Sequence, residues 1–386
     1  MAAAVVAVPA AEMPVASGDP VSYSPAAAAA DAELETAGPR EQAAALAEAT
    51  RCALRGLEGV ALEQFLARQP LSLLARSEDG RGPLFWAWEA RNAGALQLLA
   101  CLGFDLLSEE TDAEGIAPWT LGGEQWQRLA DDARQIAAVT ESKTLYIIRH
   151  GFSESQEAER RMKGLRRDPR FRDAPLHADG IVQAKNLRAA ASEWNVEAVL
   201  CSPLRRALHT AALVFGAEAQ AQSWWHKIAE EPRRPPLELS ELLREFPPDR
   251  PENIGVPQQE LRSWLRAVAA PEPANFQDFC GRRRELWDTE REWALFQQLS
   301  VPHTRADAQY SLKELQEFVT RQLPKFFGEV LQREERVLAL VSHYGALNRL
   351  LQAAVGLRPN LANCGAVRLR ITRTASGWLC GPPEPL

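Results

Sequence analysis

Short apolar runs alternate with amphipathic helical patterns along the second half of the chain. The apolar runs have the length of buried strands, and the longer patterns repeat their apolar residues at helical spacing. We expect strands at 145–148, 196–200 and 337–341 and helices at 178–194, 203–214, 312–332 and 345–355. Strands that alternate with helices in this way predict an α/β fold with a mostly parallel sheet and helices on both faces.

The first of these apolar runs ends in a charged tip. It leads directly into Arg149, His150 and Gly151, and Ser153 lies two residues further on. Open α/β sheets hold their ligands at the carboxyl ends of parallel strands. Gly151 would let the backbone approach a ligand closely, and Ser153 can cap a helix or donate to an anion. The tip therefore predicts a phosphate-handling site.

A purely helical pattern precedes residue 132. Short apolar helices separated by Gly- and Pro-marked turns run from 41 to 132, and Gly80 and Pro83 recur as Gly115 and Pro118. A Gly turn, a Pro at a helix start and two short helices resemble the ankyrin repeat. We therefore expect a small all-α, ankyrin-like domain, which implies a surface for a protein partner. An unrelated helical bundle is the alternative.

The remaining segments complete the predicted domain organisation. Residues 1–40 are rich in Ala and Pro and carry no turn-and-strand pattern, which predicts a disordered tail. Residues 133–386 contain all the predicted strands and form the catalytic domain. Within them, the segment at about 218–310 is rich in Pro and Trp and is long for a loop, so we expect an insertion with structure of its own.

Composition excludes several classes of protein. The chain is 46% hydrophobic and 25% charged, as in ordinary globular proteins, and no stretch approaches the roughly 20 apolar residues of a membrane span. A net charge of -7 argues against nucleic-acid binding, which needs a broad basic surface. The 6 cysteines are scattered singly, which favours reduced thiols in a cytoplasmic protein over disulfides or a zinc site.

Four polar motifs lie at predicted strand ends or helix starts. They read Arg149-His150-Gly151, Ser202-Pro203-Leu204-Arg205-Arg206, Leu243-Arg244-Glu245 and Ser342-His343-Tyr344-Gly345. In this order and setting they resemble the histidine phosphatase superfamily, which contains phosphoglycerate mutases and acid phosphatases. The resemblance covers about residues 144–371 and implies a phosphoglycerate mutase-like fold for this part of the chain.

The resemblance implies a role for each motif. His150 is the nucleophile that forms a phosphohistidine intermediate, and His343 donates to the oxygens in transfer. Arg149 and Arg206 bind the phosphate, because a guanidinium presents a planar fork of donors that a lysine lacks. Glu245 best matches the acid that protonates the leaving oxygen.

Gly151 and Ser153 complete the substrate-binding set. The resemblance implies neither a metal nor a cofactor, since imidazole is the nucleophile and arginines supply the positive charge. His177 and His209 fall on no catalytic position, and we interpret them as structural. Arg205 lies about 100° from Arg206 around a helix, so we expect it to face solvent.

We therefore expect a phosphomonoester hydrolase that acts on a phosphorylated small molecule or a phosphoprotein. Phe152 replaces the Glu or Gln usual after Arg-His-Gly, and Gln156 replaces the usual Asn; both changes argue against a mutase. Phosphoglycerate mutase-type transfer and a catalytically weak phosphate-binding scaffold are the alternatives. Basic residues crowd 160–172, either as a collar that attracts a phosphorylated ligand or as a solvated face.

Overall fold

The computed structural model describes residues 38–216, 235–268, 270–281, 288–299 and 305–386. The tail predicted at 1–40 lies almost entirely outside the described residues, as does part of the insertion predicted at 218–310. The chain forms two compact units. Unit 1 comprises residues up to Ser142 together with Arg370–Pro382, and unit 2 comprises Lys143–Leu369 together with Pro383–Leu386.

Unit 1 is built mainly from helices. They are α2 (Pro39–Gly56), α3 (Gly59–Arg68), α4 (Pro83–Ala90), α5 (Ala93–Cys101) and α6 (Trp126–Val139). Trp86 and Trp88 of α4 are buried in the core of this unit, and the indole N–H of Trp88 donates to the carbonyl oxygen of Leu106 at 3.0 Å. Two buried indoles supply much apolar area, and the polar atom of Trp88 is satisfied.

Unit 1 also contains residues from the C-terminal end of the chain. Strands β5 (Ala366–Thr374) and β6 (Gly377–Cys380) form an antiparallel hairpin, and Leu379 packs into the helical core. Residues 133–386 were all expected to belong to the catalytic domain. In the structure, residues 133–142 and Arg370–Pro382 belong to unit 1, and the return of the second segment is a long-range association that no local pattern encodes.

The described strands form one sheet in the order β3-β2-β4-β1-β5-β6. The other strands are β1 (Ser142–Arg149), β2 (Ala198–Cys201), β3 (Leu237–Leu239), β4 (Val337–Ser342) and β7 (Glu384–Pro385). The pairs β1–β4, β4–β2 and β2–β3 are parallel, whereas β5 pairs antiparallel with β6 and β7. The α/β fold is thus confirmed, with a mixed sheet whose antiparallel part was not predicted.

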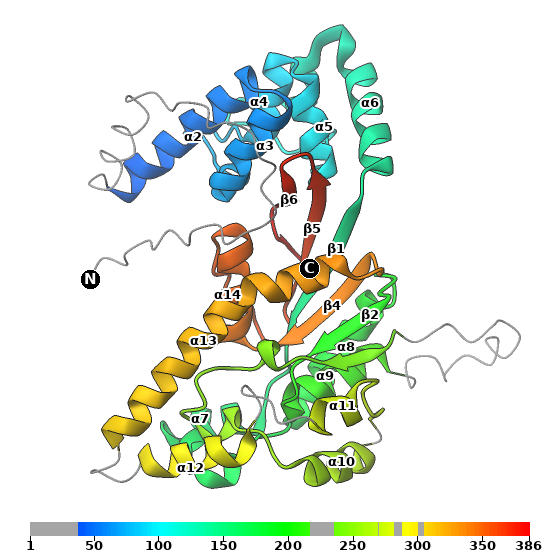
Figure 1. Ribbon diagram of the computed structural model, residues 1–386. Helices are drawn as coiled ribbons and strands as arrows, with labels where there is room; N and C mark the ends of the chain where they lie inside the picture. The colour runs from blue at the N-terminus through cyan, green and yellow to red at the C-terminus, as the bar shows by residue number, and fades with distance from the viewer. Residues whose placement is uncertain (1–37, 217–234, 269, 282–287, 300–304) are drawn as a thin grey trace, which may run out of the picture. The chain divides into compact units, whose positions relative to one another are not determined.

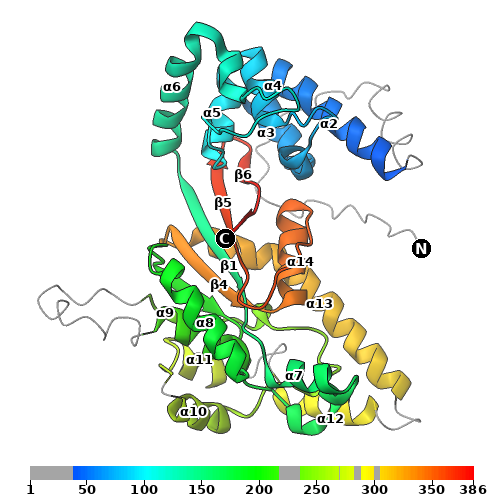
Figure 2. The ribbon, with the colours of Figure 1, turned by 180° about the vertical axis from the view of Figure 1, so that it is seen from behind.

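Helices cover both faces of this sheet in unit 2 (Figures 1 and 2). Tyr146 and Ile148 point into a cluster with α9 (Arg205–Phe215), α10 (Gln258–Ala267) and α11 (Phe276–Gly281). Leu145 and Ile147 alternate with them and are also buried. Helices α13 (Arg305–Gln332) and α14 (Tyr344–Val355) lie on the other side of the sheet from α9. Burial on both faces explains why β1 reads as a continuous apolar run.

Candidate active site

His150 directly follows β1 and is fixed through both its backbone and its ring. Its N–H donates to the carbonyl oxygen of Ser342 at 2.9 Å, at the end of the adjacent parallel strand β4. Its ring Nδ1 lies 2.7 Å from the carbonyl oxygen of Gly151. A carbonyl only accepts, so Nδ1 carries the proton and Nε2 keeps a lone pair. The buried ring therefore presents Nε2 as its nucleophilic atom.

Gly151 lies where the loop after β1 comes close to the first turn of a helix that contains Gly180. A Cβ atom at this position would lie 2.6 Å from the carbonyl oxygen of Gly180, so no side chain fits without moving the backbone. The N–H of Gly151 donates to the Thr210 hydroxyl at 3.0 Å. Gly151 thereby ties the loop that carries His150 to helix α9.

Arg206, in the first turn of α9, places a buried guanidinium against His150. Its Nε donates to His150 Nε2 at 3.3 Å, its Nη2 donates to Asn253 Oδ1 at 3.0 Å, and its Nη1 donates to the carbonyl oxygen of Glu252. Burial, followed by the charge of Arg206 and then that of Arg149, lowers the pKa of His150 well below its usual value. His150 is therefore a neutral imidazole beside a fixed cation.

Arg149 is the last residue of β1 and is half-buried. Its Nη1 donates to the carbonyl oxygen of Leu361 at 2.6 Å, and its guanidinium lies 5.2 Å from the centre of the Tyr344 ring. Its Nε is buried and has no hydrogen-bond partner in the described part of the chain. A buried donor without a partner is rare, and it is suited to bind an anion.

His343 follows β4 as His150 follows β1, so the parallel pairing brings the two imidazoles together. Their ring centres are 4.9 Å apart and their planes are tilted by 55°. His343 Nε2 lies 2.7 Å from the Ser202 hydroxyl oxygen, and its buried Nδ1 has no partner among the residues described. Burial and then the charge of Arg206 lower the pKa of His343 well below its usual value.

Glu245 is held at the start of α14. Its Oε2 accepts a hydrogen bond from the N–H of Gly345 at 2.9 Å, and its Oε1 lies 3.8 Å from Nη2 of Arg349. Burial raises the pKa of Glu245 above its usual value, although the Gly345 N–H and Arg349 partly oppose this. A carboxyl whose pKa is raised retains its proton more readily, as a general acid requires.

A cavity of about 330 Å³ connects these side chains. Five predicted site residues line it, namely Arg149, His150, Ser153, Arg206 and Glu245. Gly151 and His343 adjoin His150 without being among the lining residues. The structure thus gathers the predicted set around one cavity, although the four motifs are far apart in the sequence.

Ser153 is the N-cap residue of α7 (Glu154–Arg161), and its N–H donates to Gln156 Oε1 at 3.1 Å. Gln156 in turn exchanges side-chain hydrogen bonds with Asn363, whose Nδ2 also donates to the carbonyl oxygen of His150 at 3.1 Å. These contacts fix the loop after β1. Asn363 was not predicted from the sequence as a residue that positions the site.

Ser202, Thr210 and Asn253 were also missed as partners of the site. Ser202 lies in a recognised motif, so its place beside the strand end was a usable signal. Thr210 lies one helical turn beyond Arg206, on the same face of α9. Asn253 follows a stretch of Pro and charged residues, which gives no periodic signal.

Several basic residues of the segment 160–172 form ion pairs with nearby carboxylates. Arg160 and Arg161 form ion pairs with Glu157 at 2.7 and 2.8 Å. Of this segment, Arg166 lines the cavity, where its Nη2 lies 2.9 Å from Glu252 Oε1. Within this segment, Arg166 is therefore the residue placed to contact a ligand in the cavity.

The expectation for Arg205 was wrong. Its side chain is only 15% exposed and donates to the carbonyl oxygens of Asp173 at 2.7 Å and Arg172 at 2.9 Å. The loop before α8 (Ala178–Ala191) covers it, which helical geometry alone does not reveal. His177 accepts from the N–H of Asp179 as a helix cap, and His209 packs edge-on against a tryptophan.

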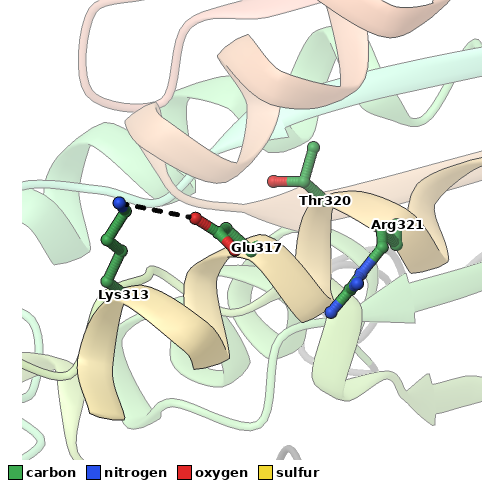
Figure 3. Close-up of a pocket in the computed structure, with 4 residues that line it drawn as sticks. All are labelled: Lys313, Glu317, Thr320 and Arg321. Atoms are coloured by element: carbon green, nitrogen blue, oxygen red, sulfur yellow. Dashed lines mark ion pairs between the residues drawn. The ribbon is translucent and has the colours of Figure 1, made fainter. Parts of the chain in front are cut away.

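A second cavity, of about 510 Å³, lies along α13. Figure 3 shows Lys313, Glu317, Thr320 and Arg321 lining it, with Lys313 and Glu317 ion-paired at 3.8 Å. None of the predicted site residues is there. Among the described residues, no group of three or more His, Cys, Asp or Glu could hold a metal ion.

No described helix combines the length and the apolar character that crossing a membrane requires. The cysteines whose side chains are described, Cys52, Cys101, Cys201, Cys364 and Cys380, are all free thiols.

Comparison with known proteins places this geometry in context. No curated protein matches the sequence. Solved structures similar to it include a phosphoglycerate mutase from Bacillus anthracis, at 18% identity and TM-score 0.35, covering 64% of this chain and 93% of that one. An alpha-ribazole phosphatase from Shigella flexneri is 19% identical, at TM-score 0.31, covering 62% and 96%. A phosphoserine phosphatase from Entamoeba histolytica is 14% identical, at TM-score 0.33, covering 62% and 96%.

Residues 145–253 match the model of the histidine phosphatase superfamily, branch 1. The matched segment contains His150, Arg206 and Glu245, whereas His343 lies beyond it. This match supports the resemblance of residues 145–253 to the histidine phosphatase superfamily.

Proposed function

We propose that this protein is a phosphomonoester hydrolase that works through a phosphohistidine on His150. The observation that carries the proposal is the pair of bonds to the His150 ring. Nδ1 donates to the Gly151 carbonyl, so Nε2 is unprotonated and meets the guanidinium of Arg206 in a buried cavity. A neutral imidazole with an oriented lone pair beside fixed cations is suited to attack a phosphoryl group.

In the first step, His150 Nε2 attacks phosphorus and the bond from phosphorus to the ester oxygen breaks. The proton of the Glu245 carboxyl passes to the leaving oxygen, so an alcohol departs and a carboxylate remains. The N–H of Arg206 that now meets Nε2, together with the unpaired Nε of Arg149, would bind the phosphoryl oxygens. Their charge offsets the negative charge that develops during transfer.

In the second step, water attacks the phosphohistidine and the bond from Nε2 to phosphorus breaks. The Glu245 carboxylate takes a proton from that water, which restores the acid and releases inorganic phosphate. His150 returns to its neutral form with the proton on Nδ1. The same residue acts first as acid and then as base, as microscopic reversibility requires.

We further propose that unit 1 is an ankyrin-like module that binds a protein partner in the cytoplasm. Two features support the repeat. The turns at 77–81 and 112–116 lie next to each other, since Ala113 N–H donates to the carbonyl oxygen of Asp79 at 2.8 Å. Arg81 Nε also donates to Asp112 Oδ2 at 2.9 Å. Stacked turns of this kind are what successive repeats require.

Turnover of p-nitrophenyl phosphate and acid-labile labelling of the protein by radioactive phosphate test the proposed hydrolase. We expect His150→Ala to lose both, because the imidazole that forms the bond to phosphorus is gone. Undiminished turnover in this variant would exclude the mechanism. Exchange of labelled phosphate between phosphoglycerates without net hydrolysis would favour a mutase. Phosphate binding with neither reaction would favour a scaffold.

A further inference from the structure

The Ser202 hydroxyl lies at the end of β2 and is completely buried. Two groups approach its oxygen. The N–H of Leu204 donates to Oγ at 3.3 Å, and Nε2 of His343 lies 2.7 Å away. A hydroxyl can donate one hydrogen bond and accept two. The N–H of Leu204 takes one of the two acceptor sites, and the hydroxyl proton still needs an acceptor.

The proton of Ser202 has one acceptor in the part of the chain that the structure describes. No other hydrogen bond in which Ser202 Oγ could donate is present there, and a buried hydroxyl without an acceptor is costly. If Nε2 carried the ring proton, it would donate to Oγ and leave the Ser202 proton unpaired. If Ser202 donates to Nε2, every polar atom of the hydroxyl is satisfied.

The second arrangement determines which nitrogen of His343 carries the proton. The pKa of His343 is lowered well below its usual value by burial and by Arg206, so the ring is neutral and has a single N–H. With Nε2 as acceptor, this N–H is on Nδ1. Nδ1 is buried and has no partner among the described residues, while the ring lies 4.9 Å from the ring of His150.

We propose that Ser202 is a positioning residue that holds His343 in its Nδ1–H form, with this N–H kept unpaired for the phosphoryl oxygen. The inference rests on the proposed function for the identity of the ligand, but not for the tautomer. In the opposite tautomer, Nδ1 would present a lone pair to an anionic phosphoryl group and repel it. Either ring nitrogen of a neutral histidine can carry the proton. The hydrogen bond from Ser202 to Nε2 makes Nδ1 of His343 the donor.

Nuclear magnetic resonance of the full chain, labelled with ¹⁵N in histidine, tests this directly. His343→Gln identifies the signals of His343 by their loss. We expect the native protein to show His343 as neutral and protonated on Nδ1, and Ser202→Ala to lose that single-tautomer pattern. A native ring protonated on Nε2 would overturn the inference, whether or not the protein hydrolyses anything.

Kinetics with p-nitrophenyl phosphate gives a second readout. We expect Ser202→Ala to lower kcat by about 100-fold with a much smaller change in KM, since a transition-state donor is lost. Ser202→Thr, which retains the hydroxyl, should recover most of kcat and the native tautomer. If Ser202→Ala does not fold, the native spectrum and Ser202→Thr still decide the question.

Ser72→Ala is the matched control, because Ser72 is equally buried but lies in unit 1. It should leave kcat and the His343 signals unchanged. Equal kcat in the native protein and a folded Ser202→Ala variant would contradict the positioning role. No turnover in the native protein, combined with an Nδ1–H ring, would refute the proposed hydrolase and leave the tautomer assignment standing.

Discussion

Glu245 and Gly345 are joined by a hydrogen bond of 2.9 Å from the main-chain N–H to the carboxyl Oε2. The Glu245 carboxyl can lie this close to the backbone only because Gly345 has no side chain, since a Cβ atom there would overlap Oε1 of Glu245. The N–H at the start of α14 also favours the carboxylate that forms after proton donation. The glycine thus places the proposed acid and prepares it for its change of charge.

Gly345→Ala should displace Glu245 and slow the step that needs an acid. We expect kcat/KM on an alkyl phosphate, whose leaving oxygen must be protonated, to fall by about 100-fold, because kcat/KM reports the formation of the phosphohistidine and not its hydrolysis. The effect on p-nitrophenyl phosphate should be much smaller, because nitrophenolate leaves without a proton. Steady-state rates on the two substrates provide the measurement.

Gly328→Ala is the control for adding a methyl group, since nothing lies within 4 Å of the corresponding Cβ position in α13. Its rates on both substrates should equal those of the native protein. Equal losses of kcat/KM on the two substrates in Gly345→Ala would show that Glu245 is not the acid.

Stability should depend on pH through the two buried imidazoles. Burial lowers the pKa of His150 and of His343 in the folded state, while the unfolded chain titrates near 6.5, about the ordinary histidine value. Between these limits the unfolded chain binds more protons. The two neutral imidazoles therefore make their full contribution to the free energy of unfolding above about pH 6.5. This contribution is lost as pH falls towards the lowered folded-state pKa values.

Urea unfolding at a series of pH values measures this loss. We expect the free energy of unfolding to fall by up to about 1.4 kcal/mol per pH unit for each histidine as pH drops below 6.5. His150→Gln should remove one of the two contributions and give a shallower dependence. An identical pH dependence in the variant and the native protein would contradict the prediction.

Local pattern was sufficient for the parts of the fold that are buried on both faces. Residues 145–148 and 337–341 are uninterrupted apolar runs, and both lie within strands of the sheet. Strand β3 has only three residues, with Glu238 at its centre, so no periodicity marks it. The antiparallel pairing of β5 with β6 and the return of 370–382 to unit 1 depend on tertiary packing, which single-residue patterns do not express.

The site residues likewise include some that the sequence predicts and some that it does not. His150 and His343 follow apolar strands and were found from the sequence, and parallel pairing of β1 with β4 explains why they meet. Their partners were not found. Ser202 contacts His343 across 141 positions of sequence, and Asn363 contacts His150 across 213. Polar pairs at such separations follow from the fold and carry no spacing of their own.

A buried ion pair connects the segment of Glu245 to the insertion. Arg244 donates from Nη1 and Nη2 to the two carboxylate oxygens of Glu292, at 2.7 and 2.8 Å, and Glu292 lies in α12 (Thr289–Leu299). The Glu292 side chain is 3% exposed. Removing one charge of such a pair leaves the other buried without its counter-charge, which is costly.

Glu292→Gln should therefore destabilise the protein by about 3 kcal/mol or more. Because Arg244 precedes Glu245, we also expect lower turnover of alkyl phosphates. Urea unfolding measures the first effect. The control is Glu272→Gln, since Glu272 forms a comparable pair with Arg262 at 3.0 Å but is 42% exposed, so its loss should cost less than about 1 kcal/mol. Equal costs for the two variants would contradict the role assigned to the buried pair.

The two interpretations of the basic segment 160–172 predict different effects for Arg166 and Arg160. Arg166 lines the cavity, its side chain is 27% exposed, and its Nε is buried without a partner among the described residues. Arg160 belongs to the same segment, is 67% exposed and is paired with Glu157. If the segment acts by direct contact with a ligand, only the loss of Arg166 should change KM. If it acts through a long-range electrostatic field, the loss of either arginine should change KM, and added salt should abolish the change.

Arg166→Met and Arg160→Met are compared on 3-phosphoglycerate and glycerol 3-phosphate, which differ in a carboxylate. We expect Arg166→Met to raise KM for 3-phosphoglycerate by about 10-fold, since a charge-assisted hydrogen bond is lost, and to change KM for glycerol 3-phosphate much less. Arg160→Met should leave both values unchanged. Equal, salt-sensitive changes in the two variants would show a long-range field, and no change in either would show that the segment is a solvated face.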